Sequence, residues 1–440
     1  MNTANFFQEA LLDGKDFLIQ GLVNLSTLTS FIEFIQGFIF YYPLFMTYLW
    51  IIGAIYYYYH WDKETKVDEP PTLDFYPLVS ILVPCHNEED NICEVMEWLN
   101  IQTYPNYEII AVNDGSTDNT AKVLESLAQK YDRLRVIHFA ENQGKAMGLR
   151  MAAIAARGEY FVCIDGDALL DPHATTWLVS HFMDSPRVGA ITGNPRIRNR
   201  STLLGRLQVG EFSSIIGMIK RTQRIYGRVF TASGVVTAFR RRALHNVGYW
   251  SVDMITEDID ISWKLQTNYW DIRYEPNALC WILMPETILG LWKQRLRWAQ
   301  GGNEVLLRYW RSLVDWKRRR MWPVFLEYLV SVSWAYCMAF FFFIYFAKFF
   351  IPIPESLQVE VLIPGVAGMI LGPTCLLQLF IGAVIDRKYE KGLLKNFFWM
   401  IWYVLGFWMI NFLTSFVGLI KAILKPKGQR AIWVSPDRGV

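Results

Sequence analysis

The sequence lacks the signatures of several common function classes. Its six cysteines form no C-x-x-C pair, and their spacing with the six histidines does not match a zinc site. Neither the dinucleotide fingerprint G-x-G-x-x-G nor a P-loop of the form G-x-x-x-x-G-K-S/T occurs. The cysteine spacing argues against thiolate metal sites and predicts that the cysteines are reduced. The missing motifs remove the main support for a dinucleotide site or a P-loop.

A strong net charge and a basic leader are also missing. The formal charge is +2, which argues neither for nor against an acidic partner, and we expect no nucleic-acid partner. Residues 1–34 carry four acidic side chains against one lysine, whereas a cleavable signal peptide needs a basic start. We therefore expect this stretch to be a short lead-in to the first apolar run.

Long apolar runs are abundant instead. Hydrophobic residues make up 52% of the chain and aromatic residues 16%. Four runs, at about 38–59, 323–350, 359–385 and 397–424, each come near the ~20 residues that a membrane-spanning helix needs. The sequence predicts a multi-pass membrane protein with these parts: lead-in and first span 1–60, linker 61–77, globular domain 78–310, basic segment 311–322, C-terminal spans 323–424 and tail 425–440.

The distribution of charge predicts which side the globular domain faces. Residues 293–320 hold nine Lys or Arg against two acids, immediately before the second run. By the positive-inside rule this end is cytoplasmic, and binding of the basic block to anionic lipid would give the same side. A full span at 397–424 would send the basic tail outside, against that rule. A re-entrant or interfacial segment removes the conflict, although the 28 residues suit one tilted span.

Strands alternate with helices in the globular segment. Strand-like runs occupy 78–84, 107–113, 134–139 and 160–165, and helices begin between them at about residues 90, 118 and 144. This order predicts an α/β domain with a mostly parallel sheet and helices on both faces. In such sheets, ligands bind beyond the carboxyl ends of the strands.

Polar clusters follow these strand ends. They are CHNEED at 85–90, NDGSTD at 113–118, NQGKA at 142–146 and DGD at 165–167. Each alone is explained by turns and helix caps, but together they suit a nucleotide diphosphate with its metal. Asp165 and Asp167 repel each other unless a cation compensates them, and hard divalent cations prefer carboxylate oxygens.

Seven motifs in order give the domain a family resemblance. They are PCHNEE, VNDGSTD, CIDGD, ITGNPR, SGV at 233–235, ITEDIDISWKL and QRLRW. The chain resembles the inverting family-two glycosyltransferases, in the processive membrane branch that includes cellulose, chitin and hyaluronan synthases. The resemblance covers about 78–310 and implies a GT-A-like domain inserted between transmembrane helices. Residues 193–227 and the tail motif WVSPDRG further resemble the bacterial synthases of poly-β-1,6-N-acetylglucosamine, and sugar identity comes from that resemblance alone.

The resemblance implies a donor site at the strand ends. Asp165 and Asp167 would share Mg²⁺ or Mn²⁺ with UDP-N-acetylglucosamine, with Asp167 the firmer metal ligand. The metal would stabilise UDP as the leaving group. Asp114 would accept a hydrogen bond from the uracil, and Lys145 would lie near the nucleotide.

The resemblance also implies a base and an acceptor site. Asp258 would take the proton of the acceptor hydroxyl, with Glu257 on the acceptor side, although the helix dipole alone also favours acids there. In QRLRW, Gln294 and Trp298 would contact the growing polysaccharide, and Arg297 would meet the diphosphate. A tryptophan near a membrane is otherwise commonly an interfacial anchor.

These inferences predict a processive enzyme of the bacterial cytoplasmic membrane that makes biofilm polysaccharide and exports it. Aromatic residues in the spans could line the export route, although an interfacial aromatic belt explains them as well. The resemblance suggests a small membrane subunit and activation by cyclic di-GMP. The alternatives are another membrane β-glycan synthase, a non-processive transferase acting on a lipid phosphate, and an idle nucleotide sensor, against which the intact Asp165, Asp167 and Asp258 argue.

Overall fold

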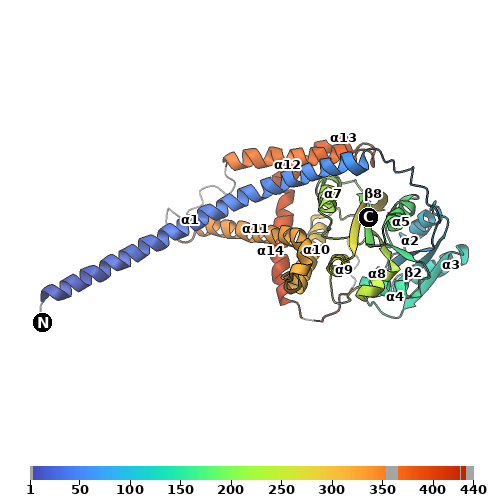
Figure 1. The fold of residues 1–440 in the computed structure, drawn as a ribbon, viewed down its shortest axis with the longest axis horizontal. Helices are drawn as coiled ribbons and strands as arrows, with labels where there is room; N and C mark the ends of the chain where they lie inside the picture. The colour runs from blue at the N-terminus through green and yellow to red at the C-terminus, as the bar shows by residue number, and fades with distance from the viewer. Residues whose placement is uncertain (1–2, 353–364, 427, 433–440) are drawn as a thin grey trace. The chain divides into compact units, whose positions relative to one another are not determined.

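The computed structural model describes residues 3–352, 365–426 and 428–432 (Figure 1). It divides into two units, one formed by Met1–Thr47 with Ser331–Thr374, the other by Tyr48–Val330 with Cys375–Val440. The first unit holds most of α1 (Thr3–Tyr57) and α11 (Trp322–Ala347), and the start of α12 (Gly365–Asp386). Within it, the indole Nε1 of Trp334 donates to the carbonyl of Ile39 at 3.0 Å and so joins α11 to α1.

An eight-stranded sheet organises the second unit. Its strand order is β3-β2-β1-β4-β7-β6-β8-β5. The pairs β1·β2, β1·β4, β2·β3 and β6·β8 are parallel, and β4·β7, β6·β7 and β5·β8 are antiparallel. The strands are β1 (Val79–Cys85), β2 (Tyr107–Asp114), β3 (Leu134–Phe139), β4 (Tyr160–Ile164), β5 (Leu169–Leu170), β6 (Val188–Ile197), β7 (Val236–Arg240) and β8 (Asp271–Ile282). The predicted α/β class with a mostly parallel sheet is confirmed.

Helices cover both faces of this sheet, as the alternating pattern predicted. Ile81 of β1 joins the core that contains α2, α3 and α5, and its neighbour Leu82 joins the core that contains α4, α8 and α9. Successive residues of a strand point to opposite faces, so a strand buried on both faces is expected to be mostly apolar, and in β1 the buried Ser80 donates to Glu108. These helices are α2 (Ile92–Asn100), α3 (Thr120–Lys130), α4 (Lys145–Ala155), α5 (Ala174–Asp184), α8 (Arg241–Val247) and α9 (Glu257–Thr267).

A second group of helices completes this unit. The π-helical segments η1, η2 and η5 extend or join α-helices, and η3 is a short 3₁₀ turn. The group consists of η1 (Tyr58–Asp62), α6 (Leu203–Glu211), η2 (Phe212–Gly217), α7 (Met218–Ile225), α10 (Ile288–Leu313), η3 (Trp316–Met321), α13 (Leu393–Met400), η5 (Tyr403–Phe407) and α14 (Trp408–Leu424).

Three helices are long and apolar enough to cross a membrane, which supports a membrane protein. They are Ser30–Asp62, Trp316–Ala347 and Ala367–Asp386. Three of the four predicted spans therefore have matching helices over the described part of the chain.

The fourth predicted span is interrupted. Residues 393–424 form α13, η5 and α14, and α14 has only 17 residues. Both ends contact the sheet-bearing unit, because Asn396 donates to the carbonyl of Arg206 at 2.9 Å and Lys425 pairs with Glu304 at 2.8 Å. A full span would carry the tail away from that unit. These contacts match what a re-entrant or interfacial segment would give, and the full span stays a prediction.

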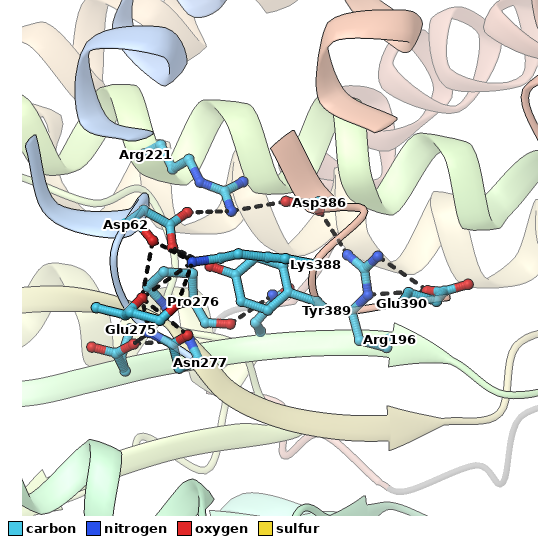
Figure 2. A network of polar contacts seen from close by, with 12 residues as sticks. Asp62, Arg196, Arg221, Glu275, Pro276, Asn277, Asp386, Lys388, Tyr389 and Glu390 are labelled. Atoms are coloured by element: carbon cyan, nitrogen blue, oxygen red, sulfur yellow. Dashed lines mark hydrogen bonds and ion pairs between the residues drawn. The ribbon is translucent and has the colours of Figure 1, made fainter. Parts of the chain in front are cut away.

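A largely buried set of charged side chains connects the end of η1, which follows α1, and the end of α12 to the sheet, and we call it the buried ion network (Figure 2). Arg221 of α7 pairs with Asp62 at 3.2 Å and with Asp386 at 2.8 Å, and all three side chains are fully buried. Arg196 of β6 pairs with Asp386 at 2.7 Å and with Glu390 at 3.0 Å. The network consists of Asp62, Arg196, Arg221, Asp386, Lys388 and Glu390.

Candidate active site

Lys145 lies at the centre of a charge cluster at the strand ends. It is the first residue of α4 and follows Gly144, whose φ of +87° suits glycine. Its Nζ pairs with the carboxylates of Asp165 and Glu257, the latter at 3.3 Å, and donates to the carbonyl of Gly234 at 3.2 Å. Burial alone would lower the pKa of Lys145, but these carboxylates raise it. The ammonium therefore stays charged.

Asp114 supports the loop that presents Lys145. It ends β2 and is fully buried, and its carboxylate accepts from the backbone N–H of Gln143 at 2.6 Å and of Gly144 at 2.8 Å. Burial raises the pKa of Asp114, and the two hydrogen bonds oppose the rise. A contact between Asp114 and uracil remains a prediction, but the structure gives this residue a positioning role.

Asp165 and Asp167 lie in the turn after β4, with Asp167 buried. Burial raises the pKa of Asp165, Lys145 lowers it, and the neighbouring Asp167 raises it again. Burial is the largest cause of this rise, and a divalent cation at this turn would stabilise the ionised carboxylates. Among the described residues, no group of three or more His, Cys, Asp or Glu side chains could hold a metal. A cation would therefore need further ligands from a diphosphate and water.

Asp258 is held as the second residue of α9, near Lys145. Its Oδ2 accepts from the backbone N–H of Gly234 at 3.1 Å, and its Oδ1 accepts from that of Ile259 at 2.9 Å. A side chain at Gly234 would place Cβ 3.2 Å from Asp258 Oδ2 and 3.3 Å from Lys145 Nζ, so glycine permits this close approach. Burial and the carboxylate of Glu257 raise the pKa of Asp258 to about 6, despite the opposing charge of Lys145. That value suits a general base at neutral pH.

A cavity of about 470 Å³ opens beside Lys145 and Glu257, and we call it the basic cleft. Its size lies within the ~300–1,000 Å³ typical of small-molecule sites. One acidic side chain lines it, against an excess of basic ones, so it fits an anionic ligand. Its charged lining consists of Lys145, Glu257, Lys293, Arg297, Lys421, Lys425 and Arg430.

The QRLRW motif lies on α10, and its side chains point to two different sides of the helix. Arg297 is exposed and lines the basic cleft. Trp298 is half-buried and packs against the main apolar core, outside the cleft lining. Gln294 is half-buried too, with Nε2 3.7 Å from the sulfur of Met284. The structure therefore brings Lys145, Glu257 and Arg297 to one cleft. Of the three residues predicted for the acceptor, Glu257 lies in that cleft, whereas Gln294 and Trp298 lie outside its lining.

Sequence reasoning missed several cleft residues. Lys421, Lys425 and Arg430 come from the end of α14 and the segment after it, more than 100 residues beyond the domain motifs. Their charge was visible in the sequence, but it was interpreted only as a topological signal. Arg295, inside QRLRW, was also passed over.

Comparison with known proteins identifies the family. Residues 77–301, which are half of the chain, match the family described as "Glycosyltransferase like family 2". The chain belongs to this family. It is 38% identical over 415 residues to a poly-beta-1,6-N-acetyl-D-glucosamine synthase of Staphylococcus epidermidis, with 92% of this chain and 98% of the relative covered. A synthase of the same name from Staphylococcus aureus strain MW2 is 38% identical over 409 residues, with the same shares covered.

A solved structure shows the same fold. The mannosyltransferase PcManGT of Pyrobaculum calidifontis, in complex with GDP-Man and Mn²⁺, matches with a TM-score of 0.59 and 19% identity. The match covers 90% of this chain and 99% of that one. The family 2 glycosyltransferase therefore has a GT-A-like sheet flanked by long apolar helices at both ends.

Proposed function

We propose that this family 2 glycosyltransferase transfers N-acetylglucosamine from UDP-N-acetylglucosamine to a growing β-1,6-linked polysaccharide of the biofilm matrix. The near full-length similarity to synthases of that name supports the substrate pair. The transfer chemistry rests on one observation. Asp258 has a pKa raised to about 6 and lies near Lys145, which lines the basic cleft.

In the proposed reaction, the acceptor C6 hydroxyl attacks the anomeric carbon as the bond from that carbon to the UDP oxygen breaks. Asp258 takes the hydroxyl proton, and the bonding electrons leave with UDP. A single displacement inverts the α-linked donor to a β-linkage. Lys145 and Arg297 provide positive charge for the diphosphate as the leaving-group charge develops.

A divalent cation completes the proposed donor site. Asp165 and Asp167 would hold Mg²⁺ or Mn²⁺, and the ion would neutralise diphosphate charge when bound. The two neighbouring carboxylates in the turn after β4 support this assignment, and the related fold of PcManGT was solved with Mn²⁺. Asp165 then has two cationic partners, Lys145 and the metal, so the lysine would hold this carboxylate in place.

Processive synthesis and export complete the proposal. Trp298 and Gln294 would contact the terminal sugars of the product, with the domain facing the cytoplasm as the basic flank at 293–320 predicts. Polysaccharide hydroxyls lose water in hydrocarbon without replacement, so a polymer needs a protein route across the bilayer. The three apolar helices would provide part of that route.

Incubation of purified membranes with labelled UDP-N-acetylglucosamine tests the proposal. Long polymer is the expected product, and EDTA should abolish it while added Mg²⁺ or Mn²⁺ restores it. A short glycolipid would instead indicate a non-processive lipid-phosphate transferase. Bound nucleotide without any transfer would indicate a sensor, and either result would overturn the proposal.

A further inference from the structure

Two arginines of QRLRW, two residues apart on α10, have opposite surroundings. Two residues turn an α-helix by about 200°, so Arg295 and Arg297 must point to different sides. Arg297 is exposed in the basic cleft, whereas Arg295 is 6% exposed and pairs through Nη2 with Glu211 Oε2 at 2.5 Å. Arg295 is therefore turned away from the proposed diphosphate site, and the motif needs a second explanation for it.

Arg295 stacks on Trp298, one turn further along α10. Its guanidinium carbon lies 4.4 Å from the centre of the indole ring, within the range of cation–π contact. A planar guanidinium covers one indole face and restricts rotation of the ring. Trp298 also packs against the main apolar core, so the part of the ring that neither Arg295 nor the core covers would be the part available to a sugar.

Glu211 fixes the guanidinium from a second helix. It ends α6, it is 3% exposed, and its other oxygen, Oε1, accepts from Nδ2 of Asn411 at 3.1 Å. Asn411 belongs to α14, so side chains from α6, α10 and α14 converge on the stacked pair. Apolar packing alone could hold a tryptophan, and burial of an ion pair carries a desolvation cost. An ordering role for the pair gives a reason for this arrangement.

We propose that Arg295, held by Glu211, is a positioning residue that fixes the indole of Trp298 against the acceptor sugar. The inference rests on the proposed function, because it takes Trp298 as the acceptor platform. It assigns Arg297 to the donor and Arg295 to the acceptor side of the same motif. Loss of Arg295 should then weaken retention of the growing chain and leave donor binding unchanged.

The test compares Arg295→Met, Arg295→Lys and the double variant Arg295→Met/Glu211→Gln in the full-length protein. Arg297→Lys is the matched control on the same helix, and Trp298→Ala tests the platform itself. Polymer length, UDP released per folded enzyme, KM for UDP-N-acetylglucosamine and thermal stability are measured for each. The double variant matters because removal of one partner leaves the other charge buried and unpaired, whereas removal of both does not.

We expect Arg295→Met and the double variant to shorten the mean polymer by about two- to fivefold, the scale of one lost cation–π contact. KM for the donor should stay within twofold. Arg295→Lys keeps the charge but loses the planar stack, so its polymer should be of intermediate length. Arg297→Lys should show the reverse pattern, with a raised KM and nearly unchanged length.

Two results separate failure of the inference from failure of the proposed function. If Trp298→Ala shortens the polymer but the stable double variant makes polymer of parental length, Arg295 is only structural and the inference is wrong. If Trp298→Ala itself leaves length unchanged, the acceptor platform of the proposed function is wrong, and the inference falls with it.

Discussion

Two clusters of Asp, Glu, Lys and Arg in the sheet-bearing unit differ in their balance of charge. In the buried ion network, Arg221 and Asp386 are fully buried and every acid meets a base (Figure 2). In the basic cleft, the cations outnumber the one lining acid, and the Lys145 side chain is 17% exposed, less than the 22% of Lys388 at the edge of the network. The closed cluster satisfies its own charges, whereas the open one leaves positive charge for a ligand. The balance of charge, more than residue type, distinguishes the buried ion network from the basic cleft.

The largest effect should come from the base beside the open cluster. Asp258→Asn keeps the size of the side chain and one of its two backbone hydrogen bonds, because the amide nitrogen cannot accept from Gly234 or Ile259, and the amide cannot take the acceptor proton. General-base catalysis contributes ~10² to 10⁴-fold, so polymer synthesis should fall by that order. Metal-dependent UDP binding, measured by titration of the purified protein, should persist.

Asp167→Asn is the matched control for this prediction. Removal of a metal ligand should weaken UDP binding and transfer together. Near-normal synthesis by Asp258→Asn would show that the base is misassigned. Equal loss of UDP binding in both variants would contradict the separation of base and metal ligand.

The sequence predicted the local part of the candidate active site, and Lys145 and Glu257 of that part line the open cluster. Asp165, Asp167 and Lys145 each follow a strand whose apolar run is readable, and parallel strands bring their carboxyl ends to one edge. The helix with Glu257 and Asp258 was also readable, from Thr256 and the apolar pattern after it. The later strands β5 to β8 were not predicted, because their antiparallel pairings join segments far apart in the sequence.

The closed cluster could not be predicted from the sequence. Asp62 and Asp386 lie more than 300 residues apart, at the ends of two apolar helices. Charges at such ends are ordinarily explained by the membrane boundary, and no local pattern links them to Arg196 or Arg221. For the same reason, the sequence did not predict that Lys425 lines the basic cleft, because it lies more than 100 residues after the domain motifs. Pairings that only the tertiary fold creates leave no periodic signal in the chain.

Disruption of the buried ion network should lower the free energy of unfolding and leave the rate of sugar transfer nearly unchanged. Asp386→Asn leaves the buried guanidiniums of Arg196 and Arg221 short of one carboxylate, and loss of a buried partner costs about 3–5 kcal/mol. Thermal unfolding in detergent should begin at markedly lower temperature. Activity per folded molecule should remain close to parental, because the network does not line the cleft.

An exposed pair provides the control for that prediction. Lys66 and Glu69 pair at 2.7 Å with side chains 65% and 62% exposed, and such pairs contribute about 0–1 kcal/mol. Lys66→Gln should therefore leave the unfolding temperature nearly unchanged. Equal stability of Asp386→Asn and Lys66→Gln would show that the network is not a structural cluster.

The raised pKa of Asp258 predicts a pH dependence with a definite sign. With a pKa of about 6, the base is increasingly protonated below pH 6, so kcat/KM should fall about tenfold per unit at lower pH. The free energy of unfolding should change in the opposite direction, and it should fall as the pH rises. A carboxyl with a raised folded pKa binds protons more tightly when folded, so its ionisation lowers stability as pH rises from about 4 to 6.

The stability and activity of Asp258→Asn at pH 7.5 should consequently diverge. The variant loses transfer but should unfold at a temperature close to that of the parent, because removal of an unfavourable buried charge offsets the one backbone hydrogen bond that the amide cannot accept. A pH–rate profile and thermal unfolding of both proteins check this. An acidic limb with a midpoint near pH 4 would show that Asp258 keeps an ordinary carboxyl pKa.

The smallest effect should come from single cations at the rim of the open cluster. Lys421 is exposed and lines the basic cleft beside several other cations, so its loss removes one of many charges facing the ligand. Exposed charge pairs are weak and are screened by salt, so Lys421→Gln should raise KM for UDP-N-acetylglucosamine only about two- to fivefold at low ionic strength. The difference should nearly vanish in about 1 M salt, where the screening length is about 3 Å.

Lys317→Gln, on the exposed basic segment outside the cleft lining, should leave KM unchanged at either salt concentration. A rise in KM for Lys421→Gln that does not depend on salt would mean that this lysine contacts the donor directly. Lys421 would then have a defined partner, as the charges of the buried ion network do.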